Sequence, residues 1–146
     1  IFAVGDYTIV RVDLATGAST NLDPANDMLR HATWRAVWAS PDGQAFVGGD
    51  ARYLLQWTGA RFVAHDMPAN IEVLSIRGLW GTSYGSLWAA GLDVDGRSFL
   101  ARFNGAFWTS VNPGTDLGLT AIAGLKNGEF WLGGPGGAIL HGSVEP

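Results

Sequence analysis

The 146-residue chain contains no cysteine, which excludes disulfide bonds and cysteine-ligated metal sites. Charged residues make up only 15% of the sequence, against about a quarter in a typical soluble domain. The nine Lys and Arg residues form no basic patch and the formal net charge is −4, so a nucleic-acid partner is not expected. No apolar run approaches the roughly 20 residues of a membrane helix, so membrane insertion is not expected either.

Glycine and tryptophan are abundant, with 21 and seven residues respectively, and hydrophobic residues reach 47%. The length favours one domain. Many glycines and aromatics combined with few charges indicate an all-β fold of short strands and tight turns.

A short aromatic segment occurs four times, as IFAVG at 1–5, AFVGG at 45–49, LWAAG at 87–91 and FWLGG at 130–134. Its aromatic residues are spaced by 44, 42 and 43 positions, and a glycine follows each at the same distance. A fixed period in this range is the mark of a repeat architecture. We designate this segment strand B of the repeat.

Three further segments recur around strand B, each rich in β-branched or aromatic residues and bounded by Gly, Pro, Asn or Asp. Strand A precedes B at 35–40, 77–82 and 120–125. Strand C follows B at 8–14, 53–59, 99–105 and 138–142. Strand D closes the repeat at 18–23, 60–66 and 106–112. No segment has the periodicity of a long helix.

Four antiparallel strands in about 43 residues are typical of a β-propeller blade. The predicted domain is residues 1–146, with blades at about 1–33, 34–75, 76–118 and 119–146. Stacking of blades is expected to bury the repeated aromatic residues, which are Trp38, Phe46, Trp80, Trp88 and Trp131. Trp34, Trp57 and Trp108 align with hydrophobic residues of other repeats and are also predicted to be core.

The segment LWGTSYGSLWAAG at 79–91, continued by FLARFNGAFW at 99–108, resembles the repeats of bacterial, often secreted, β-propeller proteins. Those blades follow the pattern W-G-[ST]-S…W-A-x-G…I-L-H-x-x-G-x-x-W, and GGPGGAILH at 133–141 matches its B–C part. The resemblance implies the propeller fold and an extracellular, periplasmic or cell-surface location. It implies no activity.

The first repeat lacks strand A and the last lacks strand D. Three arrangements are compatible with this count: a segment of a larger propeller, a ring completed by other copies or chains, or a small four-bladed ring with an incomplete closing blade. We favour the first two.

The B–C connections vary in length over a constant scaffold, which is where binding sites are usually built. This side of the blades also carries the D–A connections at 23–31, 65–72 and 112–116. The candidate binding residues in the B–C connections are Asp50, Arg52, Asp93, Asp95 and Arg97.

Asp93, Asp95 and Gly96 form a D-x-D-G pattern that can begin a calcium loop, although the later Glu of a full loop is absent. A solvated acidic hairpin is the favoured interpretation, and no cofactor or metal is expected. Arg35 and Arg77 share one position in strand A, which lines the channel of a propeller. They are expected either to hold an anionic group there or to contact backbone or a neighbouring Asp.

These observations predict a non-catalytic binding or scaffold propeller with a protein or glycan partner. One alternative is a subunit of a larger extracellular assembly completed by blade-edge pairing. The other is a hydrolase or lyase with a site at the central channel, for which the sequence offers mainly Arg35 and Arg77 as ionisable groups and singles out no catalytic residue.

Overall fold

A computed structural model describes residues 1–22, 29 and 31–144. Its fourteen strands form four antiparallel sheets in chain order. The first sheet contains β1 (Phe2–Gly5), β2 (Thr8–Val12) and β3 (Ser19–Asn21). The second contains β4 (Trp34–Ala39), β5 (Ala45–Gly49), β6 (Leu54–Trp57) and β7 (Phe62–Ala64). The third contains β8 (Ser75–Ser83), β9 (Ser86–Leu92), β10 (Ser98–Phe103) and β11 (Trp108–Ser110). The fourth contains β12 (Ala121–Gly124), β13 (Glu129–Gly133) and β14 (Ile139–Ser143).

The all-β prediction is confirmed, and each predicted segment overlaps one observed strand. The strand order within the sheets follows A, B, C and D, with A missing from the first sheet and D missing from the last. No α-helix is found among the described residues. The glycine-rich segment before β14 forms a short 3-10 turn, η2 (Pro135–Gly137). No described helix has the length and apolar character needed to cross a membrane.

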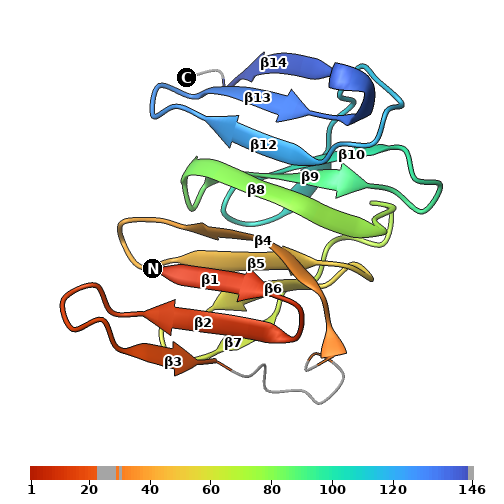
Figure 1. Cartoon of the computed structure of the whole chain (residues 1–146). Coiled ribbons are helices and arrows are strands. Elements are labelled where there is room, and N and C mark those ends of the chain that lie inside the picture. Colours follow the sequence, from red (N-terminus) through yellow and green to blue (C-terminus); the bar gives the residue numbers. More distant parts are fainter. Residues whose placement is uncertain (23–28, 30, 145–146) are drawn as a thin grey trace.

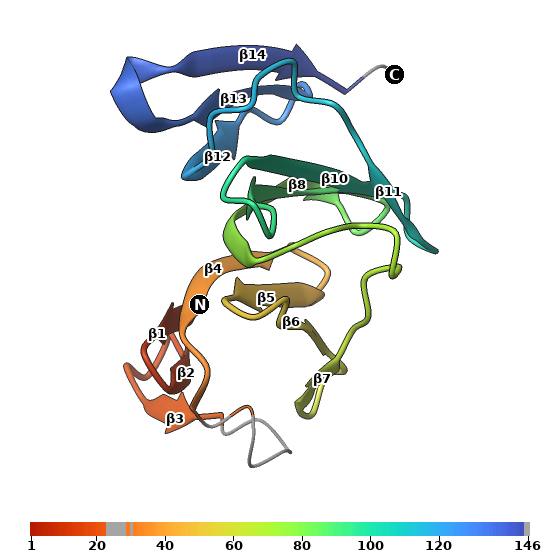
Figure 2. The same ribbon diagram turned by 90° about the vertical axis from the view of Figure 1, so that its right-hand side faces the viewer.

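The four sheets are stacked in the order of the chain (Figure 1). β1 packs on β4, β4 and β5 pack on β8, and β8 packs on β12, so each sheet contacts the next one. Viewed along the strands, the sheets fan out, with these first strands crowded together and the later strands spread apart (Figure 2). The first and fourth sheets lie at opposite ends of the fan (Figure 1).

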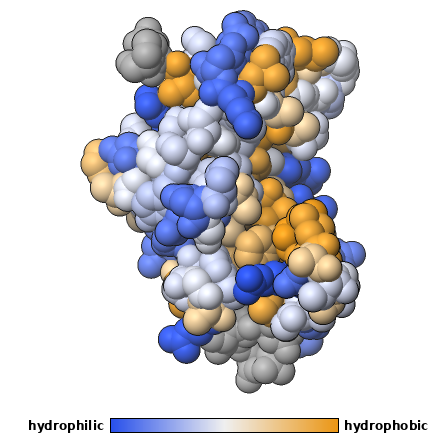
Figure 3. Space-filling model, turned by 90° about the vertical axis from the view of Figure 1, so that its left-hand side faces the viewer, coloured by the Kyte–Doolittle hydropathy of each residue, from blue (hydrophilic) through white to orange (hydrophobic). Residues whose placement is uncertain are grey.

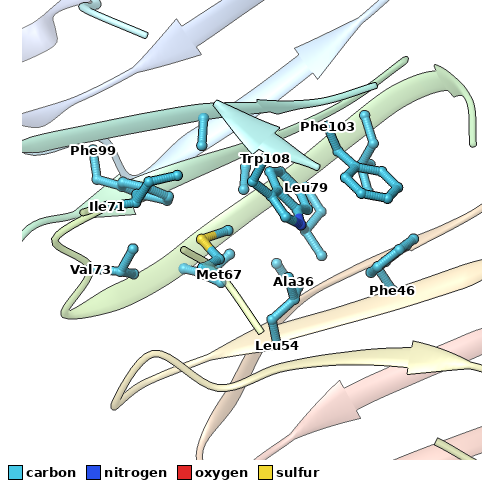
Figure 4. Packing of buried hydrophobic residues seen from close by; sticks show 14 of the residues in the cluster. Ala36, Phe46, Leu54, Met67, Ile71, Val73, Leu79, Phe99, Phe103 and Trp108 are labelled. Atoms are coloured by element: carbon cyan, nitrogen blue, oxygen red, sulfur yellow. The ribbon is translucent and has the colours of Figure 1, made fainter. Parts of the chain in front are cut away.

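The largest hydrophobic cluster fills the space between the second and third sheets (Figure 4). Phe46 from β5 meets Phe103 and Trp108 of the third sheet, with ring centroids 5.6 and 6.4 Å apart. Met67 and Ile71, in the connection between β7 and β8, complete the cluster. Full burial of aromatic side chains of this size is the main stabilising contribution that such a sheet pair can make.

Side chains of strand B alternate between the two faces of their sheet, because successive residues in a strand point to opposite sides. Ala45 and Val47 belong to the cluster shared with the first sheet, whereas Phe46 belongs to the one shared with the third. Both faces of β5 are therefore covered, and all five of its residues are buried.

The prediction of core positions holds for Trp34, Trp57 and Trp108, which are all buried. It is wrong for Trp131, which is 38% exposed on β13. Trp131 has the same position in its strand as Phe46, but no described sheet lies on that side of the fourth sheet. The repeat pattern identifies the position correctly, and the missing neighbour accounts for the exposure.

Candidate loop face

The B–C connections and the D–A connections at 65–72 and 112–116 lie on one face of the stack, at the right of Figure 1 and toward the viewer in Figure 2. The β5–β6 hairpin turns through Ala51 and Arg52, whereas the β9–β10 loop runs through Asp93–Arg97. We refer to this side as the loop face. The sheets behind it are similar, so the differences between repeats are concentrated in these connections.

Asp50 is the centre of a polar cluster at the edge of the loop face. Arg35 donates two hydrogen bonds to its carboxylate, from Nε to Oδ1 and from Nη2 to Oδ2, both at 2.7 Å. The Ser75 hydroxyl donates a third hydrogen bond to Oδ1 at 2.6 Å. Because Ser75 is in the third sheet and Asp50 in the second, the carboxylate joins two neighbouring sheets.

The hydrogen bonds from Arg35 are the main cause that lowers the pKa of Asp50 below its ordinary value, with Ser75 and the charge of Arg77 acting in the same direction. The same pairing raises the pKa of Arg35. Both side chains are 38% exposed, so the ion pair is partly hydrated and contributes about 1 kcal/mol or less. Asp50 is thus held ionised, which does not suit a general acid.

Arg77 is half-buried on β8, and its Nε has no hydrogen-bond partner among the described residues. After the hydrogen bond and charge of Asp50, the charge of the Asp6 carboxylate also raises the pKa of the Arg35 guanidinium. Charges of alternating sign therefore follow the edge of the first three sheets. This edge row, defined as Asp6, Arg35, Asp50 and Arg77, is largely neutralised by its own members.

The β9–β10 loop is closed by Asp93. Its Oδ1 accepts the backbone N–H groups of Asp95 and Arg97, at 2.9 and 2.8 Å. The side chains of Asp95 and Arg97 are exposed and 3.8 Å apart. Within the described ranges, no group of three potential metal ligands is found. The two backbone hydrogen bonds to Asp93 close the loop as a hairpin with an acidic tip.

The β5–β6 turn adopts a backbone that its residues disfavour. Ala51 and Arg52 have φ of +56° and +64°, in the left-handed region that glycine or asparagine usually occupies. The turn is closed by hydrogen bonds from Gly49 to Tyr53 and from Tyr53 to Asp50. Two left-handed residues in one short turn cost about 1–3 kcal/mol each, and they project the exposed Arg52 from the loop face.

Two recesses open between these turns and the D–A connections. One of about 350 Å³ lies beside Arg52, Tyr53, His65 and Asp66. The other, of about 230 Å³, lies one repeat further on, beside Glu72, Asp93 and Ser98. Burial is the first cause that lowers the pKa of His65, and the Asp66 carboxylate opposes it.

The structure thus divides the seven candidate residues. It brings Arg35, Asp50 and Arg77 together in the edge row, and it leaves Arg52 and the β9–β10 residues on separate connections. Most of the candidate stretch at 23–31 lies outside the described residues.

Sequence reasoning missed Asp6 and Ser75. The alignment contained a signal for Asp6, because it follows Gly5 as Asp50 follows Gly49. Ser75 carries no comparable signal, since a serine before a strand is common in turns.

Comparison of the chain with protein-family models, with curated proteins and with solved structures finds no match.

Proposed function

We propose that the four sheets are blades of a β-propeller that acts as a non-catalytic binding module, and that the loop face engages a protein partner. The proposal places the protein outside the cytoplasm, as the repeat resemblance implies. The observation that carries it is the contrast between four similar sheets and the divergent turns at one end of them.

A protein partner suits this face better than a glycan does. Sugar rings stack on exposed aromatic side chains, and Trp34, Trp57 and Trp108 are buried in the core. The exposed groups of the turns include the charged side chains of Arg52 and Asp95. Charged side chains at the rim of an interface determine partner choice and association rate.

The polar groups of the loop face argue against catalysis. The carboxylate of Asp50 is occupied by Arg35 and Ser75, and the Asp93 side chain is occupied by backbone N–H groups. A catalytic acid or base needs a free proton position within reach of a substrate. Of the groups that line the recesses, His65 is half-buried with its Nδ1 3.1 Å from Gln56 Oε1, and Asp93 accepts backbone N–H groups.

The experiment compares charge reversals on two sides of the molecule. The chain is used to capture proteins from the extracellular fraction of its source, with Arg52→Glu and Asp95→Lys as variants of the loop face. Arg61→Glu is the matched control, because Arg61 is exposed on the β6–β7 turn at the opposite end of the strands, the face seen in Figure 3.

The expected result is one captured protein whose affinity falls about tenfold or more in the loop-face variants and stays unchanged in Arg61→Glu. Equal capture by all variants would contradict the proposed face. Binding on a glycan array that the loop-face variants abolish would replace the protein partner with a glycan.

A further inference from the structure

One side of every sheet carries the same kind of residue pair, and in the first three sheets this side packs against the next sheet. Strand B places an aromatic residue there, and strand C places a polar residue directly opposite it. The four cross-strand pairs are Phe2 with Arg11, Phe46 with Gln56, Trp88 with Arg102, and Trp131 with His141. We call this side the leading face of a sheet.

The opposite side of strand B carries two apolar residues that receive the aromatic residue of the preceding sheet. Phe46 is in one cluster with Leu87 and Ala89. Trp88 is in one cluster with Phe130 and Leu132, and its ring centroid is 4.9 Å from that of Phe130. We call this side the trailing face.

The first and second sheets meet in the same way. Phe2 packs against the cluster that contains Ala45 and Val47, with ring centroids 5.6 Å from both Trp57 and Phe62. The chain therefore builds one kind of sheet-to-sheet interface three times.

Each end of the stack exposes one half of this interface. The leading face of the fourth sheet exposes Trp131 by 38% and Ile139 by 74%, and Ala121, Ala123 and His141 on the same face are also exposed. His141 stacks on Trp131 with ring centroids 5.0 Å apart. The corresponding pair in the third sheet, Trp88 and Arg102, is covered by the fourth sheet.

The trailing face of the first sheet has an aliphatic area on β1 and β2. This area consists of Ile1, Ala3, Val10 and Val12, placed on one side by the cross-strand pairs of β1 and β2. Ile1 is 66% exposed and Ala3 is exposed as well. The polar residues of this side are Thr8, Ser19 and Asn21, so its apolar part is the area formed by the first residues of β1 and the last residues of β2.

We propose that the leading face of the fourth sheet docks on the trailing face of the first sheet of a second copy of this chain, and that two copies close head to tail into one ring. Trp131 of one copy takes the place beside Ile1 and Ala3 that Phe46 takes beside Leu87 and Ala89. Asp, Lys and Arg are absent from both faces. The single carboxylate, Glu129, lies at the first residue of β13, where Asn127 donates a hydrogen bond to it at 3.1 Å, so the one charge near the contact is at its edge and not at its centre.

The number of copies follows from the number of sheets. Propellers contain about four to eight blades. The described part of one copy forms four sheets, and its first and fourth sheets lie at opposite ends of the stack. Two copies together have eight sheets, which is within the range of blade numbers found in propellers. Closure of the ring rests on the propeller proposed above, whereas the docking contact rests only on the three internal interfaces.

The experiment measures the mass of the 146-residue chain in solution by light scattering and sedimentation over a wide concentration range. The expected result is a species with twice the 15.5 kDa of one copy. A monomer at all concentrations would overturn the proposal and would mean that something other than a second copy covers these faces. A series of ever larger species would overturn the closed pair. Neither result bears on protein capture by the loop face.

Charge variants then locate the contact. Trp131→Glu and Ala3→Lys each weaken association by at least about tenfold, because each buries one unpaired charge. When the two variants are mixed, the mixed pair regains one unaltered interface and one with opposite charges, so a species of double mass returns. Phe107→Glu is the control, since Phe107 is 59% exposed on the β10–β11 turn, outside both faces. Doubling that persists in both single variants, or no recovery on mixing, would contradict the head-to-tail contact.

Discussion

Trp88 and Trp131 occupy the same position in the third and fourth sheets, yet Trp88 is 6% exposed and Trp131 is 38% exposed. The two tryptophans have similar neighbours within their own sheets. The Arg102 guanidinium lies over the Trp88 ring, and the His141 ring lies against Trp131. The difference arises from the next sheet, which supplies Phe130 and Leu132 to cover Trp88. In a repeat protein, the burial of a position is thus decided by its neighbouring repeat as much as by its own sequence.

The largest effect is expected from truncating the covered member of this pair. Trp88→Ala should lower the free energy of unfolding by about 3–5 kcal/mol, because it leaves a cavity beside Phe130. Trp131→Ala should cost less than about 1 kcal/mol at concentrations where the chain is monomeric, since no described sheet packs on that side. Urea unfolding followed by circular dichroism gives both values.

Equal losses in these two variants would show that Trp131 is covered within one copy. A loss for Trp131→Ala that grows with protein concentration would instead agree with docking of a second copy.

A smaller effect is expected from the glycine that follows the aromatic residue of strand B. A Cβ at Gly91 would overlap the backbone carbonyl oxygen of Ser75 in the neighbouring strand, and neither backbone can move easily. A Cβ at Gly134, the same position in the fourth sheet, would lie 3.0 Å from the carbonyl oxygen of Gly118, and one at Gly5 would meet nothing within 4 Å.

Replacement by alanine should therefore destabilise the protein most at Gly91, by about 1–3 kcal/mol, less at Gly134 and least at Gly5. None of the three glycines has a positive φ, so the ranking measures space alone. Thermal unfolding of the three variants tests it, and a loss at Gly5 as large as at Gly91 would contradict the steric explanation.

The strands could be predicted from the sequence because period, aromatic position and turn residues all agreed. The β1 and β13 segments, for example, were identified by alignment with Phe46 and Trp88 although each lies at an incomplete sheet. The exposure of Trp131 could not be predicted, because an alignment records equivalent positions and contains no information on which sheets are present to cover them.

The candidate site was predictable only in part. Asp50 and Arg35 were selected separately, one as a loop residue and one as a channel residue, whereas the structure pairs them directly. Their pairing depends on the cross-strand register of β4 and β5, in which Trp34 lies opposite Gly49 with a bulge beside it. A bulge of one residue is not visible in a single sequence, so the sequence could predict that Arg35 contacts a neighbouring Asp but could not identify that residue as Asp50.

The smallest effect concerns pH and the covered interface between the second and third sheets. His65 is half-buried beside Phe46, Phe103 and Trp108, and its Nδ1 lies 3.1 Å from Gln56 Oε1. Burial lowers the pKa of His65 below 6.5, and the Asp66 carboxylate opposes this only in part. In the unfolded chain the imidazole regains its ordinary pKa. As the pH falls through about 6.5, the unfolded state therefore takes up a proton before the folded state does, and stability decreases until the folded-state pKa is passed.

His65→Phe should remove this part of the pH dependence, so that unfolding free energies measured at about pH 8 and about pH 5.5 differ less than in the unaltered chain. Asp66→Asn should act in the opposite direction, because it removes the charge that favours the protonated ring, and should steepen the loss of stability at the lower pH. If His65→Phe leaves the difference between the two pH values unchanged, the covered interface is not the source of the pH dependence. If Asp66→Asn reduces that difference, Asp66 does not act on His65 through its charge.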